Sequence, residues 1–111
     1  MDNVKGDSYY LNKILTDLQF VITHTNGKTK EEIQTNELLL DSIMFRLIQI
    51  AENSEKLTAK FKETHAQIPW RAIKGMRNRI VHDYGVVDAT IVYSTVTQSI
   101  PELYKDLNEL I

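Results

Sequence analysis

The sequence predicts an all-α protein, an up-and-down bundle of four to five helices that forms a single domain over residues 1–111. Its length suits one domain with one core. Only two prolines and four glycines interrupt the chain. Apolar residues recur at three- and four-residue spacing, and the alternation expected of strands is hard to find.

The first helix and the start of the second are predicted from apolar spacing and turn residues. Asn26-Gly27 ends the first helix, because glycine suits the left-handed cap. Thr29 followed by Glu32 has the spacing of a capping box, which opens a second helix. The apolar face of the first helix, predicted over residues 9–22, consists of Tyr10, Leu11, Ile14, Leu15, Leu18 and Ile22.

The second helix is predicted to be long and apolar on two sides. Such a helix is either central in a bundle or shared with another subunit, and both can hold. The pattern weakens over residues 58–67, where we expect a break or a short separate helix. One stripe is Ile33, Leu40, Ile43, Leu47, Ile50, Leu57 and Phe61, and the second face is Leu39, Met44 and Ile48.

Two further helices are predicted in the C-terminal half. Pro69 suits the first turn of a helix that stops near Tyr84-Gly85. Gly75 inside that helix costs about 1 kcal/mol relative to alanine, which indicates a close approach of another helix there. Asp88 can cap the last helix, and Pro101 should kink or break it. The apolar stripe of the last helix is Ile91, Val92, Val96, Ile100, Leu103, Leu107 and Leu110.

Composition limits the possible functions. The absence of cysteine excludes disulfides and thiolate chemistry. No apolar run approaches the roughly 18 residues of a spanning helix, and no signal-peptide pattern is present, so we expect a soluble cytoplasmic protein with no membrane partner. The net charge of −2 excludes a general polyanion binder. His24 and His65 lack companions at metal-ligand spacing, so no metal or cofactor is expected.

The most informative stretch is residues 70–84. It carries four cations and no acid until Asp83, and His82 and Tyr84 follow where the helix must stop. On an ideal helix Asn78 and His82 share a face, whereas Arg77 and His82 lie about 140° apart. Either the last turn unwinds, or a two-fold axis sets Arg77 of one chain beside His82 of another. The four cations are Arg71, Lys74, Arg77 and Arg79.

Arginine, histidine and tyrosine can hold a phosphodiester and move its protons without a metal. Histidine titrates near neutral pH and can take or give a proton. Arginine pairs with two phosphate oxygens and stabilises the charge of the transition state. Asn78 would orient the imidazole, and Tyr84 could donate to the phosphate or stack on a base. The plainer alternative is a histidine that caps helix carbonyls beside solvated arginines.

The motif Arg77-Asn78-x-x-x-His82-x-Tyr84, preceded by Ile68-Pro69-Trp70 and Gly75-Met76, resembles the signature of HEPN domains of the HepT-like toxin family. The likeness covers roughly residues 38–111. It implies an all-helical, HEPN-like homodimer whose two Arg-x4-His motifs line a cleft at the interface. It also implies a ribonuclease toxin that needs no metal and is encoded beside a minimal nucleotidyltransferase antitoxin.

The resemblance implies a role for each matching residue. Arg77 and His82 would be catalytic, Asn78 would support them, and Glu52 would lie near the cleft. The antitoxin would add AMP to Tyr84, and the added charge and bulk would occupy the cations that bind RNA. The alternative is a non-catalytic dimer that binds a nucleotide or the partner enzyme. The expected RNA-binding residues are Arg71, Lys74, Arg79 and Tyr84.

Overall fold

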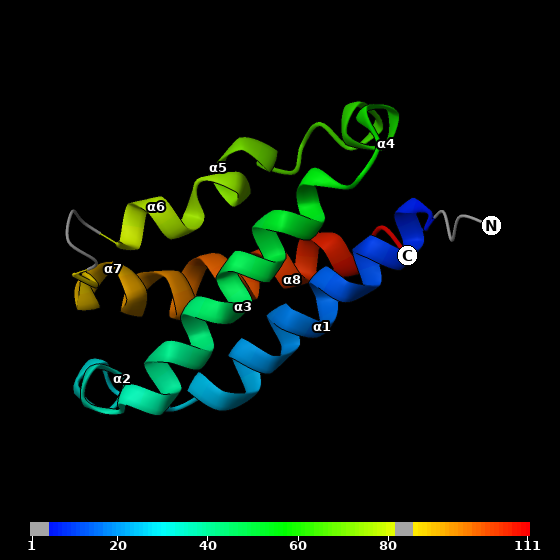
Figure 1. Ribbon diagram of the computed structural model, residues 1–111. Coiled ribbons are helices and arrows are strands. Elements are labelled where there is room, and N and C mark those ends of the chain that lie inside the picture. Colours follow the sequence, from blue (N-terminus) through cyan, green and yellow to red (C-terminus); the bar gives the residue numbers. More distant parts are fainter. Residues whose placement is uncertain (1–4, 82–85) are drawn as a thin grey trace.

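Two long helices, α1 (Asp7–Thr25) and α3 (Glu37–Glu55), run in opposite directions through the centre of the fold (Figure 1). The computed structural model describes residues 5–81 and 86–111. The C-terminal helix α8 (Ile100–Asn108) packs against α1, and shorter helices pack against α3. Within these ranges the chain forms helices and one isolated β-bridge, which confirms the predicted all-helical fold class.

The core lies where α1, α3 and the C-terminal helices meet. On α3 the buried apolar residues are Ile43, Leu47 and Ile50, as the apolar stripe predicts. Burial of such side chains supplies the main driving force for folding. Among the described residues, no helix is long and apolar enough to cross a bilayer.

The predicted capping box is confirmed, but the helix that it opens is short. The Thr29 hydroxyl accepts from the Glu32 amide at 3.1 Å, and the Thr29 amide donates to Glu32 Oε1 at 2.8 Å. Helix α2 (Lys30–Thr35) then ends, and Asn36 Oδ1 accepts from the Leu39 amide at 3.0 Å to cap α3. The prediction of one long helix from this box is therefore wrong, because Asn36 takes an extended backbone and starts a new helix.

The expected break after α3 is confirmed. Helix α4 (Ala59–Thr64) is short and separate, and Thr58 caps it. The Asp7 carboxylate accepts from the Thr58 amide at 2.8 Å and from its hydroxyl at 2.7 Å, so the start of α1 holds the start of α4. Pro69 lies one residue before α5 (Trp70–Lys74) and not inside its first turn. The Trp70 indole N–H donates to carbonyls at the end of α4 and holds α5 there.

The single helix predicted after Pro69 is two helices. Helix α5 ends at Lys74, and α6 (Met76–Ile80) begins after Gly75, whose φ of −91° and ψ of 4° are not helical. Among the described atoms, a Cβ at Gly75 would meet only the Arg71 carbonyl oxygen, at 3.6 Å. The predicted close helix–helix approach at Gly75 is therefore wrong. Helix α6 also ends sooner than expected, since Val81 is already extended. The predicted stop at Tyr84-Gly85 lies outside the described residues.

The C-terminal helices confirm the cap at Asp88 and contain Pro101. Asp88 Oδ1 accepts from the Thr90 and Ile91 amides at 3.0 and 3.1 Å, which caps α7 (Ala89–Ser94). A π-helical turn, η2 (Thr95–Ser99), then leads into α8. Pro101 has no N–H to donate to the preceding turn. One π-turn just before Pro101 interrupts the regular α-helix, and the chain stays helical through it.

Candidate active site

The described residues of the predicted site lie on three helices. Arg71 and Lys74 are on α5, Arg77, Asn78 and Arg79 are on α6, and Glu52 is on α3. All six side chains are exposed. Figure 1 shows α5 and α6 following one another along one side of α3, and both pack on it. His82 and Tyr84 lie outside the described residues.

Described residues on either side of positions 82–85 contact each other at the end of α6. Val81 and Val87 form an antiparallel bridge. The Asp88 amide donates to the Ile80 carbonyl at 2.8 Å, directly beside that bridge. Residues paired across such a bridge lie about 5 Å apart. Val81 and Val87 therefore lie side by side at the C-terminal end of α6, next to the start of α7.

The early end of α6 changes the expected relation between Asn78 and His82. That relation required a helix through position 82, but Val81 is extended. One of the two predicted arrangements needed the last turn to unwind, and helical conformation does end two residues before His82. Asn78 Oδ1 accepts from Arg77 Nη1 at 3.4 Å, so the described partner of Asn78 is the arginine. The relative placement of Arg77 and His82 stays a prediction.

The four cations do not share one environment. Lys74 Nζ is 3.4 Å from Glu55 Oε1 on α3, and the other oxygen of Glu55 is 3.6 Å from Lys62 Nζ. Arg79 Nη1 turns back to donate to the Ala72 carbonyl at 3.0 Å. Within residues 5–81 and 86–111, Arg71 and Arg77 form no ion pair with an acid. The RNA-binding role of Arg71, Lys74 and Arg79 and the catalytic role of Arg77 stay predictions.

Arg79 lies near α8, whereas Lys74 contacts α3. It lines a groove of about 310 Å³ between α5, α6 and α8, together with the acids Glu102 and Asp106. The floor of this groove is apolar, and the buried Met76 contributes to it. Two carboxylates one turn apart lower the local positive potential there. Arg79 therefore shares its groove with two acids, whereas Lys74 contacts one acid directly.

Two contacts near the site had no signal in the sequence. Lys30 Nζ donates to the Thr90 hydroxyl at 2.7 Å, which ties α2 to the start of α7 across sixty positions of sequence. Glu55 and not Glu52 is the acid that contacts the cationic segment. Both glutamates are exposed on α3, so helical spacing alone could not choose between them.

The two described histidines pack against aromatic rings. The His24 ring lies 4.3 Å from that of Phe20, and the His65 ring lies 4.6 Å from that of Phe61. In the part of the chain that the structure describes, no three histidine, aspartate or glutamate side chains gather as metal ligands would.

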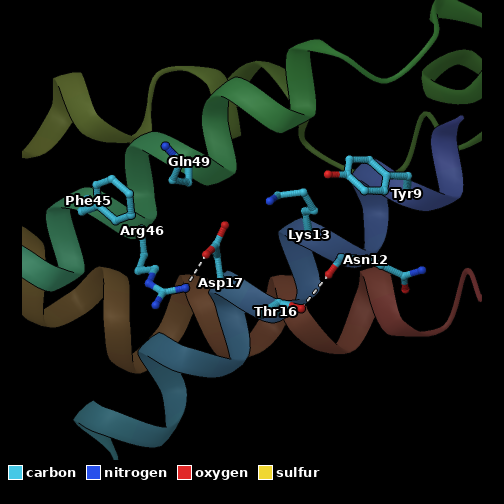
Figure 2. A pocket seen from close by; sticks show the side chains of 8 residues that line it. All are labelled: Tyr9, Asn12, Lys13, Thr16, Asp17, Phe45, Arg46 and Gln49. Atoms are coloured by element: carbon cyan, nitrogen blue, oxygen red, sulfur yellow. Dashed lines mark hydrogen bonds and ion pairs between the residues drawn. The ribbon is translucent and has the colours of Figure 1, made fainter. Parts of the chain in front are cut away.

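A second cavity lies on the other side of α3, between α1 and α3 (Figure 2). Its volume is about 460 Å³, and no residue of the sequence-predicted site lines it. An ion pair between Arg46 Nη1 and Asp17 Oδ1, 2.7 Å long, joins the two helices at this cavity. We call this cavity the α1–α3 groove.

The sequence model of the HepT-like ribonucleases matches residues 14–110, a range that includes α6 and positions 82–85. The chain belongs to the HepT-like ribonuclease family. The predicted resemblance to this family is thereby confirmed. No solved structure matches the chain.

Three relatives illustrate the match. A protein of Caldanaerobacter subterraneus subsp. tengcongensis named "Putative RNase" is 32% identical over 102 residues, covering 92% of this chain and 91% of that protein. A Thermococcus cleftensis protein named "Probable ribonuclease HepT" is 29% identical over 94 residues, 85% of this chain and 86% of its own. A "Gamma-glutamylcyclotransferase and putative RNase" of Methanocaldococcus jannaschii is 29% identical over 103 residues, which is 93% of this chain but 46% of that longer protein.

Proposed function

We propose that this protein is a ribonuclease that cleaves RNA without a metal, with Arg77 and His82 as its catalytic residues. The observation that carries the proposal is the match of the HepT-like ribonuclease family over residues 14–110. The names of the relatives point to the same reaction class. The bridge between Val81 and Val87 supports it further, because Val81 directly precedes His82 in sequence and lies at the end of the helix that carries Arg77.

The proposed reaction is an attack by the ribose 2′-oxygen on the adjacent phosphorus. The imidazole of His82 takes the 2′-OH proton, and the new P–O2′ bond forms as the P–O5′ bond breaks. An imidazolium, supplied by the second copy in a shared cleft, returns a proton to the leaving 5′-oxygen. Arg77 donates to the non-bridging oxygens and stabilises their added charge. The products are a 2′,3′-cyclic phosphate and a 5′-hydroxyl.

Asn78 and Glu52 are proposed as supporting residues. The 3.4 Å contact between Asn78 Oδ1 and Arg77 Nη1 supports a role in holding the guanidinium. Glu52 is exposed on α3, one turn before the glutamate that pairs with Lys74. From that position its carboxylate can orient a cation of the same segment.

We propose that two copies pair through the end of the bundle where Val81 and Val87 form their bridge. Leu38, in the first turn of α3, is 79% exposed, and Val86, next to the bridge, is 59% exposed. In Figure 1 the first turn of α3, helix α2 and the start of α7 lie at this same end. Exposed apolar side chains at one place are typical of an interface. Pairing there would bring two copies of the α6 end together.

The dimer is tested by sedimentation velocity. The protein should sediment as a dimer, and the double variant Leu38→Glu with Val86→Glu should sediment as a folded monomer with little cleavage. A wild-type protein that remains monomeric at micromolar concentration would contradict the shared cleft.

We propose that the partner is a cytoplasmic nucleotidyltransferase antitoxin that neutralises this toxin by modifying Tyr84. The phenol oxygen would attack the α-phosphorus of ATP, pyrophosphate would leave, and the phenol proton would pass to solvent. The AMP group would add negative charge beside the cations of α5 and α6. Incubation with ATP and a candidate antitoxin should raise the mass by one AMP and stop RNA cleavage. The Tyr84→Phe variant should remain unmodified.

The reaction is tested with purified protein and RNA in EDTA. Cleavage should give cyclic-phosphate ends, and Arg77→Ala and His82→Ala should each lower the rate by at least about 100-fold. The control Lys60→Ala, on α4 at the other end of the molecule, should cleave normally. Thermal unfolding should be the same for all four proteins. Cleavage that survives in both active-site variants would reject the proposal, and RNA binding without cleavage would favour the non-catalytic module.

A further inference from the structure

The guanidinium of Arg46 in the α1–α3 groove is held in place and has further N–H donors available. Arg46 Nη1 donates to Asp17 Oδ1, and the guanidinium carbon lies 3.8 Å from the centre of the Phe20 ring. These two contacts hold the group in place, and the carboxylate uses one of its five N–H donors. The Arg46 side chain is still 27% exposed. A planar, pre-positioned guanidinium binds a phosphate with a smaller loss of side-chain entropy than a free arginine.

The surroundings of the groove carry more positive than negative charge. Lys13 projects from α1 between Tyr9 and Asp17 in Figure 2. Its Nζ lies 5.9 Å from the centre of the Tyr9 ring, and Lys5 Nζ lies 4.9 Å from that centre. The groove is thus lined by two cations, Lys13 and Arg46, and by one carboxylate, Asp17, that is already paired with Arg46, while Lys5 contacts the Tyr9 ring at the edge of the groove. This balance favours an anionic ligand.

Two exposed aromatic rings mark the ends of the groove. Phe45 is 56% exposed and Tyr9 is 41% exposed, and Figure 2 shows them on opposite sides of Lys13 and Asp17. An inorganic anion would not use these rings. Exposed aromatic rings alternating with cations are the pattern that binds single-stranded nucleic acid, because each base has a face that stacks.

We propose that the α1–α3 groove binds a nucleotide of a single-stranded RNA, with its phosphate on Arg46 and Lys13 and its base on Phe45. This inference rests on the proposed ribonuclease function. Figure 1 shows α6 on one side of α3 and α1 on the other, so a strand held at the α6 end can cross the exposed face of α3 into the groove. The positive charge favours RNA over a second copy of the chain, whose own groove would carry the same charge.

The test measures RNA binding by fluorescence anisotropy with 2′-O-methyl RNA, which lacks the attacking hydroxyl. Lys13→Ala and Phe45→Ala should each weaken binding of a strand of about twelve nucleotides by about tenfold. The Lys13 variant should also lower the salt slope of log K by about 0.7. Binding of a trinucleotide, and cleavage of a dinucleotide substrate, should be unchanged. The controls Lys60→Ala and Ile111→Ala remove an exposed charge and an exposed apolar side chain elsewhere, and they should bind the long strand normally.

The outcomes separate this inference from the proposed function. If the wild-type protein cleaves RNA and the Lys13→Ala and Phe45→Ala variants bind the long strand normally, only the proposed RNA binding in the groove is overturned. Wild-type protein that neither binds nor cleaves RNA would overturn both. Sedimentation of the Phe45 variant provides a further check. A change from dimer to monomer would show that a second copy covers this face, and it would overturn RNA as the occupant.

Discussion

The α1–α3 pair and the α5–α6 pair differ in length and in what they contribute to the molecule. Helices α1 and α3 have 19 residues each, whereas α5 and α6 have five each. Helices of five residues are not stable alone and depend on tertiary packing. The long pair therefore provides most of the stability. The short pair packs on it and holds the exposed cations.

The largest expected effect is a loss of stability from a change in the buried face of α3. Leu47 is fully buried on α3, so Leu47→Ala should lower the free energy of unfolding by about 2–5 kcal/mol through lost burial and a cavity. Urea unfolding followed by circular dichroism measures it. Arg77→Ala, an exposed change on α6, should stay within about 0.5 kcal/mol of the wild type. Comparable losses from both variants would contradict the division.

The same division explains which parts of the fold the sequence could predict. Apolar spacing located α1, the core face of α3 and the C-terminal helices, because long amphipathic helices repeat their signal over several turns. The capping box predicted at Thr29 is present, but the long helix predicted to follow it ends at Thr35, and Asn36 caps a new one. Asparagine favours both turns and caps, and only the geometry of its neighbours decides whether a helix stops there.

A substitution at Gly75 should change the free energy of unfolding by a moderate amount, and it tests the α5–α6 pair directly. A methyl group fits at this position, because the nearest atom to an added Cβ is the Arg71 carbonyl oxygen at 3.6 Å. Gly75→Ala should therefore raise the free energy of unfolding by about 0.5–1 kcal/mol and favour a continuous helix through α5 and α6. Thermal and urea unfolding measure the gain. A loss of stability would show that the break at Gly75 relieves a constraint.

The site was less predictable than the fold, for a physical reason. Residue types and the motif selected α5, α6 and the segment after them, but ion pairs between helices have no local signal. Lys74 meets Glu55 only because α5 packs on the end of α3, and Lys30 meets Thr90 only because α2 packs on α7. The same holds for Arg46 and Asp17, whose pairing creates a groove that spacing along the chain could not reveal.

The Glu55 ion pair provides a smaller test, on RNA affinity. Exposed pairs of this kind contribute roughly 0–1 kcal/mol. Glu55→Gln should free the Lys74 ammonium for phosphate and raise RNA affinity by about two- to threefold at low salt. Anisotropy at several salt concentrations measures it. Glu63→Gln, which removes an exposed charge on α4, should leave the affinity unchanged. Equal gains from both variants would mean that overall charge, and not Lys74, is responsible.

The smallest effect concerns pH and the capping box of α2. The hydrogen bond from the Thr29 amide, followed by the Thr29 hydroxyl and the charge of Lys28, holds the pKa of Glu32 below its ordinary value. A lowered pKa in the folded state means that ionised Glu32 stabilises the fold at neutral pH, and that this contribution is lost as pH falls through the folded pKa. Glu32→Gln keeps an acceptor for the Thr29 amide but has no charge to titrate. Its melting temperature should lie slightly below that of the wild type at about pH 7 and converge with it towards about pH 3. A gap that stays constant over that range would show that the charge of Glu32 does not contribute to the cap.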